Sequence, residues 1–314
     1  MSNRFDFQGL KETGEYFEGW YVKCTDPTNE LSIALIPGIA QFSNRESFVQ
    51  YTIQYKDQSF SGKVTFDRDD FHVVPEPYSI LMPKFVLSEK GVRASLKDEK
   101  NDIILDFSFG PFLPIRQTAF MPSIMGPLEY LTMPCAHDIV SMKHDVSGTL
   151  IINGEKIVLD SAIGYMEKDR GHTFPSNYLW LQTNVFEDDT HAALSLAVAT
   201  IEKKPLHLTG SIAIFHDGIN EHRFATYLGT KHEVIVDNDG QGYTVVLTSL
   251  GKRLKTSVRL LNAQELIAPM NREMDFPIKE SVKTELKVWF KEKGKPEVFL
   301  SSDHAAAELV NWKA

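Results

Sequence analysis

Short segments of alternating apolar and polar residues, separated by turn residues, dominate this sequence. The clearest is GTLIINGEKIVLD (148–160), where Asn-Gly lies between two apolar runs and suits a type I′ hairpin turn. Residues 234–261 predict three consecutive strands, and residues 282–300 predict another hairpin. Helical periodicity is confined to two short candidates, residues 263–266 and 305–312. The pattern predicts an all-β protein.

The two halves of the chain repeat one order of elements. EGWYVK (18–23) and LSIAL (31–35) in the first half correspond to NYLWLQ (177–182) and LSLAV (194–198) in the second, and a further strand follows each pair. We therefore predict two units in tandem, residues 1–163 and 164–314. Each is long enough for a barrel of roughly eight strands, which can hold one small ligand.

A proline-rich segment lies late in the first half, at residues 109–142, and carries five prolines among many Met and Phe residues. This proline density excludes regular elements, yet the segment is too apolar to be a free linker. We expect an irregular segment that packs against the barrels.

The composition limits the classes of function. Hydrophobic residues make up 42% of the chain and the formal net charge is −9, which argues against a dedicated nucleic-acid binder. Cys24 and Cys135 match no disulfide or metal pattern and are expected to be reduced thiols. The N-terminus has no secretory signal pattern, and the longest apolar stretch is too short to span a membrane. We expect a soluble, cytoplasmic protein that makes transient contact with a membrane surface to collect a lipid.

Three stretches together resemble the tocopherol cyclase family, including its bacterial members. They are YFEGWYV (16–22), HDIVSMKHDVSGTLIINGEKI (137–157) and GYMEKDRGHTFPSNYLWLQTNVF (164–186), and ELKVWFKEKGKPEVFL (285–300) extends the likeness almost to the C-terminus. The central block, with Glu-Lys-Asp, Gly, Phe-Pro and a Trp-containing strand, is the most specific part.

The resemblance implies paired lipocalin-like β-barrels, distantly related to carotenoid hydratases, and a hydrophobic, prenylated ligand. Plant members protonate a prenyl double bond, and the phenol oxygen of a prenyl hydroquinone then adds to it, without a redox cofactor or a metal. Two positions depart from the family pattern: Arg170 stands where Trp is frequent, and Pro134 where an acidic residue is usual. An arginine would make a wall of the site cationic, which suits an anionic head group or a surface ion pair.

Protonation of an alkene requires an acid shielded from water, and a buried carboxyl group is the usual solution. Glu167 and Asp169 are the first candidates, because they precede the Trp180 strand and can be aimed into a barrel mouth. The alternative is a turn in which Glu167 and Asp169 pair with Lys168 and Arg170. Other acidic residues in the resembling stretches are weaker candidates: Glu18, Glu129 and Asp138.

Histidine could accept the proton of the phenol or of water, and His137 and His172 are best placed by motif. The alternative is a histidine bonded to backbone at a strand end. His137, His144 and His172 match no metal-ligand spacing, so we expect no metal site.

Strand alternation places Trp180, Gln182 and Asn184 on one face, where they could form a cavity wall with a polar anchor. Packing in the core and exposure to solvent are the alternatives. The remaining expected ligand contacts are Arg170, Glu18 and Tyr21, whereas Trp20 is expected to be a core residue.

Three hypotheses follow. The first is an enzyme that cyclises or hydrates a prenyl double bond, with Glu167 or Asp169 as acid and His172 or His137 as base, and without a cofactor. The second is a non-catalytic, lipocalin-like carrier of a hydrophobic small molecule. The third is a structural protein whose barrels are filled by side chains.

Overall fold

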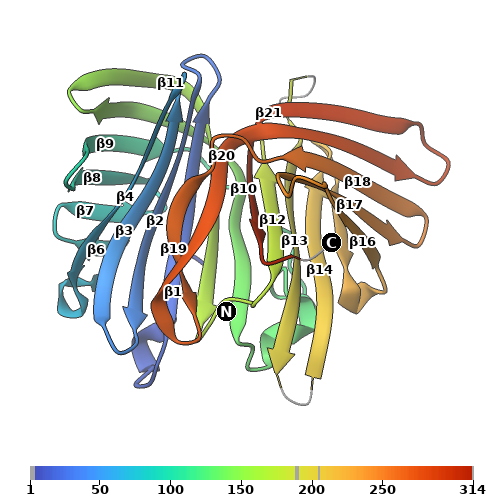
Figure 1. Cartoon of the computed structure of the whole chain (residues 1–314), viewed down its shortest axis with the longest axis horizontal. Coiled ribbons are helices and arrows are strands. Elements are labelled where there is room, and N and C mark those ends of the chain that lie inside the picture. Colours follow the sequence, from blue (N-terminus) through green and yellow to red (C-terminus); the bar gives the residue numbers. More distant parts are fainter. Residues whose placement is uncertain (1–3, 188–190, 204–205, 313–314) are drawn as a thin grey trace. The chain divides into compact units, whose positions relative to one another are not determined.

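A computed structural model describes residues 4–187, 191–203 and 206–312, and these residues form strands, turns and four 3₁₀ helices (Figure 1). The helices are η1 (Gly9–Lys11), η2 (Arg68–Asp70), η3 (Gly126–Tyr130) and η4 (Thr226–Leu228). The all-β prediction is confirmed. None of the helical segments in this described part of the chain is long and apolar enough to cross a bilayer.

The first sheet has eleven strands in the order β4-β3-β2-β1-β11-β10-β9-β8-β7-β6-β5, and all of its ladders are antiparallel. Two meanders, β1–β4 and β5–β10, are joined through the long β11. The strands are β1 (Phe17–Asp26), β2 (Leu31–Gln41), β3 (Arg45–Tyr55), β4 (Gln58–Asp67), β5 (His72–Pro75), β6 (Tyr78–Met82), β7 (Phe85–Ser88), β8 (Gly91–Lys97), β9 (Asp102–Phe109), β10 (Cys135–Ile152) and β11 (Glu155–Gly171).

The second sheet has the order β15-β14-β13-β12-β21-β20-β18-β17-β16, and β19 pairs with β20 beside this path. Its strands are β12 (Tyr178–Thr183), β13 (Ala193–Lys203), β14 (Leu206–His216), β15 (Glu221–Ala225), β16 (Lys231–Val236), β17 (Gly242–Ser249), β18 (Lys252–Arg259), β19 (Gln264–Met270), β20 (Glu273–Glu292) and β21 (Glu297–Val310).

Both sheets share one topology, so the predicted repeat exists at the level of strands. A four-strand meander opens each half, and its first strand pairs with the second strand of a long hairpin, β10–β11 or β20–β21. Ser32 pairs with Thr25 in the first meander, and Ser195 pairs with Gln182 in the second. This register makes Lys23, not Trp20, the counterpart of Trp180.

The hairpin predicted at residues 148–160 is confirmed as the end of β10–β11. Asn153 and Gly154 have φ values of +51° and +92°, and Ile152 pairs with Glu155 across them. Two successive positive φ angles are the geometry of a type I′ turn, which Asn and Gly adopt at low cost.

Neither helical candidate forms a helix. Residues 264–266 belong to β19, and residues 305–310 form the end of β21. Ala305, Ala306 and Ala307 are all fully buried. A strand buried on both faces loses its alternation, so a run of alanines gave a helical signal where tertiary packing imposes a strand.

The chain forms two compact units that are discontinuous in sequence. Unit 1 comprises residues 1–114, 135–174 and 266–277, and unit 2 comprises the rest. The predicted boundary between residues 163 and 164 falls inside β11, which runs unbroken to Gly171. Unit 1 also takes in a hairpin from the second half, because the Gln50 side chain bonds both the N–H and the C=O of Ile267.

The proline-rich segment is packed but not wholly irregular. It contains η3, and its last residues, from Cys135 onward, already belong to β10. Within unit 2, Arg223 donates to the carbonyl of Ser123, and the Tyr227 hydroxyl donates to that of Ile124. These bonds hold the segment against the region of β15 and η4.

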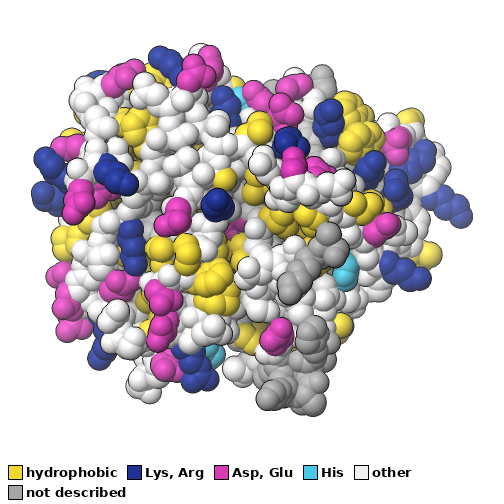
Figure 2. All heavy atoms as spheres, viewed as in Figure 1, with side chains coloured by type: hydrophobic (Ala, Val, Ile, Leu, Met, Phe, Trp, Pro, Cys, Tyr) yellow, Lys and Arg dark blue, Asp and Glu magenta, His cyan; other side chains and the backbone are white. Residues whose placement is uncertain are grey.

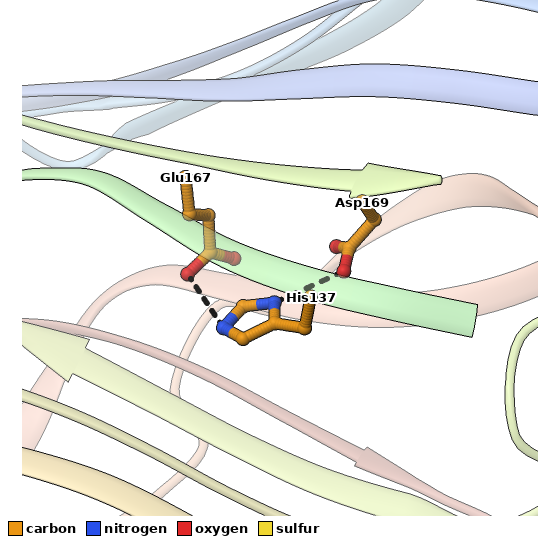
Figure 3. Close-up of side chains that lie close together, drawn as sticks. All are labelled: His137, Glu167 and Asp169. Carbon is orange, nitrogen blue, oxygen red and sulfur yellow. Dashed lines mark hydrogen bonds and ion pairs between the residues drawn. The ribbon is translucent and has the colours of Figure 1, made fainter. Parts of the chain in front are cut away.

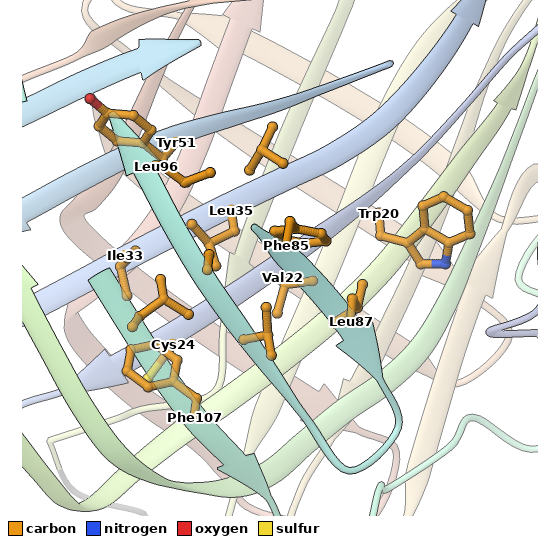
Figure 4. Packing of buried hydrophobic residues seen from close by; sticks show 14 of the residues in the cluster. Trp20, Val22, Cys24, Ile33, Leu35, Tyr51, Phe85, Leu87, Leu96 and Phe107 are labelled. Atoms are coloured by element: carbon orange, nitrogen blue, oxygen red, sulfur yellow. The ribbon is translucent and has the colours of Figure 1, made fainter. Parts of the chain in front are cut away.

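Each unit has its own hydrophobic core. In unit 1, alternate residues of β1, including Trp20, Val22 and Cys24, point into a cluster with β2, β7, β8 and β9 (Figure 4). In unit 2 the corresponding cluster takes Leu179 and Leu181 from β12. Cys24 and Cys135 are free thiols, as expected.

His144 on β10 is a buried, neutral member of the unit 1 interior. Its ring centroid lies 4.9 Å from that of Phe109 and 4.6 Å from that of Phe112. Its Nδ1 is 3.0 Å from the Ser141 hydroxyl oxygen. A Cβ at Gly164 would overlap the His144 ring, so glycine is required there. Burial lowers the pKa of His144 to about 3.

This lowered pKa predicts acid lability. The folded state binds the His144 proton only near pH 3, whereas the unfolded chain binds it near pH 6.5, so stability falls as pH drops between these values, by up to about 1.4 kcal/mol per pH unit. Urea unfolding of His144→Leu should show a flatter pH dependence in this window than wild type. The exposed His72→Leu should keep the wild-type slope, and equal slopes in all three proteins would contradict the prediction.

Candidate active site

The family-like motifs meet on three neighbouring strands, β1, β11 and β10. In the ladders, Trp20 pairs with Lys168 and Lys168 with Asp138, while Glu167 pairs with Tyr21 and Ile139. Because side chains alternate along a strand, the motif Glu-Lys-Asp is divided between the two faces of the sheet. Lys168 joins the side that carries the unit 1 core, and Glu167 lies on the opposite side.

On the core side, Glu18 and Lys168 form a fully buried ion pair. Lys168 Nζ lies 2.8 Å from Glu18 Oε1, and neither side chain is exposed to solvent. Glu18 Oε2 accepts hydrogen bonds from the Tyr16 hydroxyl and from the backbone N–H groups of Gln8 and Gly9. Burial lowers the pKa of Lys168, and the carboxylate of Glu18 opposes that effect. Glu18 therefore anchors the N-terminal segment to β1.

Further contacts on this side also hold the N-terminal segment against the sheet. Lys168 also donates to the carbonyl of Asp6, the Trp20 indole N–H donates to that of Phe5, and Arg4 lies 2.5 Å from Asp138. The predicted ligand contact by Glu18 does not fit this geometry, because its carboxylate is enclosed by protein donors. Trp20 is a core residue, as predicted.

On the opposite side, the His137 imidazole lies between two carboxylates (Figure 3). Its Nδ1 is 3.0 Å from Asp169 Oδ1, which is a hydrogen bond, and its Nε2 is 3.6 Å from Glu167 Oε2, which is an ion pair. His137 Nε2 is buried and has no hydrogen-bond partner among the described residues. β10 supplies the histidine and β11 both acids, and β10 has register shifts just beyond, after Ile139.

The charges of the cluster favour the protonated form of His137. Burial alone would lower the pKa of His137, but the carboxylates of Glu167 and Asp169 outweigh it and raise the pKa to about 9. At neutral pH the imidazole is therefore protonated, with one N–H directed at each carboxylate. Sequence analysis named all three residues, and the structure brings them together.

Aromatic and apolar groups surround this cluster. The Tyr165 hydroxyl donates to Glu167 Oε2 at 2.5 Å, and Tyr21 is the cross-strand neighbour of Glu167. Cys135 Sγ lies 3.9 Å from Asp169 Oδ1, and Cys135 packs against an apolar cluster that contains Phe17. Tyr165 was not singled out from the sequence, although its position two residues before Glu167 on the same strand face was a usable signal.

The same three side chains also offer potential metal ligands, a combination that the sequence analysis did not consider. One ligand atom from each of His137, Glu167 and Asp169 lies within 4.8 Å of the others. However, the bond between His137 Nδ1 and Asp169 leaves Nε2 and Glu167 as the pair that could face a common ion, and structural metal sites use more ligands. The arrangement suits a proton on His137 better than a bound metal ion.

Two other predicted residues lie away from the cluster. His172 Nδ1 is 2.6 Å from the carbonyl oxygen of Glu15, which is the backbone bond that the alternative interpretation described. Arg170 is directly opposite Glu18 in the ladder and therefore shares the core side with Lys168.

Trp180, Gln182 and Asn184 belong to unit 2. Leu179 and Leu181 fill the unit 2 core, so Trp180 and Gln182 point to the other face of β12, where both are nevertheless buried. Asn184 lies just beyond the end of β12.

That face of unit 2 carries two acids that sequence analysis missed. Glu280 and Glu308 are cross-strand neighbours, both buried, and Glu308 is also opposite Trp180. The Tyr178 hydroxyl donates to Glu308 at 2.6 Å, as Tyr165 does to Glu167 in unit 1. The two glutamates are far apart in sequence and carry no motif, so only the strand register shows the pair.

Comparisons with known proteins agree with this architecture. The tocopherol cyclase-like family matches residues 90–309. An AttH protein from Nitrosomonas europaea has a TM-score of 0.54 at 15% identity, covering 95% of this chain and 93% of that one. Kievitone hydratase from Nectria haematococca has a TM-score of 0.53 at 12% identity, covering 98% and 94%. A search of the curated proteins finds no match. The lipocalin-like fold predicted from the sequence is thereby confirmed.

The buried ion pair predicts strong coupling between Glu18 and Lys168. Lys168→Met should cost about 3–5 kcal/mol of unfolding free energy, because Glu18 is then left buried without its counter-ion. The double variant Glu18→Gln/Lys168→Met should lose less than the sum of the two single variants, as measured by urea denaturation. Additive losses would show that the pair is not coupled.

The His137 cluster predicts an unusual titration. In NMR spectra the imidazole should lose its proton near pH 9, and both Glu167→Gln and Asp169→Asn should lower that midpoint, because each removes a neighbouring negative charge. His144, which has no carboxylate neighbour, provides an internal control and should stay neutral throughout the titration. A His137 midpoint near 6.5 in wild type would contradict the geometry.

Proposed function

The chain belongs to the tocopherol cyclase-like family, and from this premise we propose that it is an enzyme that adds an O–H group across a prenyl double bond. The substrate would be a hydrophobic, prenylated compound of the quinol or isoprenoid type. If the O–H group belongs to the substrate, the product is a ring; if it belongs to water, the product is an alcohol. Both reactions begin with protonation of the alkene.

The observation that carries this proposal is the position of the buried His137 imidazole between the carboxylates of Glu167 and Asp169, which favours its protonated form. The side chains of His137 and Glu167 are only 13% and 6% exposed, so the proton is shielded from bulk water. An alkene is a weak base, and its protonation competes poorly with protonation of water in an open site. A shielded acid next to an apolar wall is the arrangement that the reaction requires.

The proton can be placed on Glu167 when an apolar ligand excludes water. In a low dielectric, an imidazolium–carboxylate ion pair loses solvation, so the neutral pair of imidazole and carboxylic acid becomes favoured. Glu167 then gives its proton to one alkene carbon and becomes a carboxylate, and the other alkene carbon becomes a cation.

The remaining steps restore the site. The hydroxyl oxygen of the substrate, or of water, forms a bond to the cationic carbon, and neutral His137 Nε2 accepts the released proton. The site returns to an imidazolium between two carboxylates, so no oxidant, reductant or cofactor is consumed. Asp169 acts by holding His137 Nδ1 and fixing the orientation of the ring. The rings of Tyr21 and Tyr165 on the same face could stabilise the cation.

The name of one structural neighbour, a hydratase, is consistent with this chemistry. The alternative of a carrier that binds the same ligand without changing it remains the second outcome of the test. Solvent extraction of the purified protein, followed by mass spectrometry, would identify a retained prenyl compound and provide the substrate for turnover assays.

Removal of the proposed acid should abolish turnover without unfolding the protein. Glu167→Gln should lower kcat by about 10²- to 10⁴-fold, the usual contribution of a general acid. The control Asp160→Asn changes an exposed acid on the same strand and should keep full activity. A substrate that binds wild type stoichiometrically but is never converted would establish the carrier instead.

The same mechanism fixes the sign of the pH dependence. The raised pKa keeps His137 protonated up to about pH 9, so activity should persist below that value and fall as pH rises through it. The falling limb in kcat/KM should move to lower pH in Asp169→Asn, which removes one of the stabilising charges. A rate that stays constant from pH 7 to well above 9 would exclude the imidazolium as the proton source.

A further inference from the structure

Three turns of unit 2 gather at one end of its sheet. They connect β14 to β15 (217–220), β17 to β18 (250–251) and β20 to β21 (293–296). Lys252 Nζ, just after the second turn, is 3.0 Å from His222 Nδ1, and His222 Nε2 is 2.8 Å from Asp217 in the first. The N–H of Lys293, in the third, donates to the carbonyl of Gly251. The three turns therefore form one continuous surface.

Two of these turns present aliphatic side chains where polar residues are usual. Leu250 is 101% exposed and Ile219 is 86% exposed, and each is next to a glycine with positive φ, Gly251 or Gly218. A fully exposed aliphatic side chain gains nothing from folding. Two such side chains on adjacent turns indicate a surface that contacts an apolar partner.

Basic residues surround these two side chains. The three turns and the two residues on either side of each contain five Lys or Arg and four Asp or Glu, a small positive excess on a chain whose net charge is −9. Three of the acids are paired: Asp217 with His222, Glu221 with Arg223, and Glu292 with both Lys252 and Lys295. Figure 2 shows Lys and Arg side chains along the right-hand edge, where the β17–β18 and β20–β21 hairpins end in Figure 1. The basic residues of this surface are Lys252, Arg253, Lys291, Lys293 and Lys295.

We propose that this end of unit 2 docks on an anionic phospholipid bilayer. Leu250 and Ile219 enter the headgroup region, and the surrounding lysines bind the negative surface. Exposed aliphatic side chains enter the interfacial layer of such a membrane, and the small local excess of basic residues favours the anionic headgroups on a chain that is otherwise repelled by them. The inference extends the proposed function, since a prenylated substrate resides in membranes, but the docking surface is argued from its own residues.

The test is co-sedimentation of the full chain with vesicles. Wild type should bind vesicles of phosphatidylcholine mixed with phosphatidylglycerol, more weakly at high salt and weakly to phosphatidylcholine alone. Ile219→Ser/Leu250→Ser should weaken binding about tenfold or more, since two buried aliphatic side chains are lost. Lys293→Glu/Lys295→Glu should weaken it specifically for the anionic vesicles. The control Leu228→Ser/Lys231→Glu changes an exposed Leu and Lys beyond the far end of β15 and should bind as wild type does.

Absence of wild-type binding to anionic vesicles, or equal binding by Ile219→Ser/Leu250→Ser and wild type, would overturn the proposal. A turnover assay separates this failure from that of the proposed function. With substrate in detergent micelles, Ile219→Ser/Leu250→Ser should react at the wild-type rate, whereas with substrate in vesicles it should react several-fold more slowly. Vesicle binding without turnover in either medium would leave the docking surface in place and contradict only the enzymatic proposal.

Discussion

The buried ion pair of Glu18 and Lys168 is the constraint on which the candidate site depends. A buried charge requires a partner of opposite sign, so the Lys168 side chain must lie on the face of β11 that carries Glu18 and the unit 1 core. A slip of one residue in this register would bury Glu167 or Asp169 in that core instead. The pair thus selects the register that places both acids beside His137, on the other side of the sheet.

This division explains why the motif contains charges of both signs. Lys168 neutralises Glu18 and, through the carbonyl of Asp6, holds the N-terminal segment, whereas Glu167 and Asp169 hold a proton on His137. The turn of mutually paired charges, which the sequence allowed as an alternative, does not form, because residues 167–170 continue as a strand. Neighbours in sequence are separated by the sheet, and their partners come from β1 and β10.

The sequence was sufficient for the strands, the hairpins and the repeated order, since these depend on local alternation and turn chemistry. It also sufficed to name His137, Glu167 and Asp169 through the family resemblance. It failed where the outcome depends on long-range packing. Matching Trp20 to Trp180 shifts the repeat by three residues from the register of the ladders, and because the shift is odd, Trp20 faces the core of its unit whereas Trp180 does not. The inclusion of Leu266–Pro277 in unit 1 has no local signal at all.

The register also settles what the departure at Arg170 affects. Arg170 lies opposite Glu18 and, by alternation, on the side of Lys168, so it cannot form the wall next to Glu167 and Asp169. Its positive charge acts on Tyr16, whose pKa is raised by burial and by Glu18 and is lowered again by Arg170. An arginine at this position therefore adjusts the polar anchor of the N-terminal segment. The acid–imidazole–acid cluster is built from the other face, and this departure from the family pattern leaves its three residues and their spacing intact.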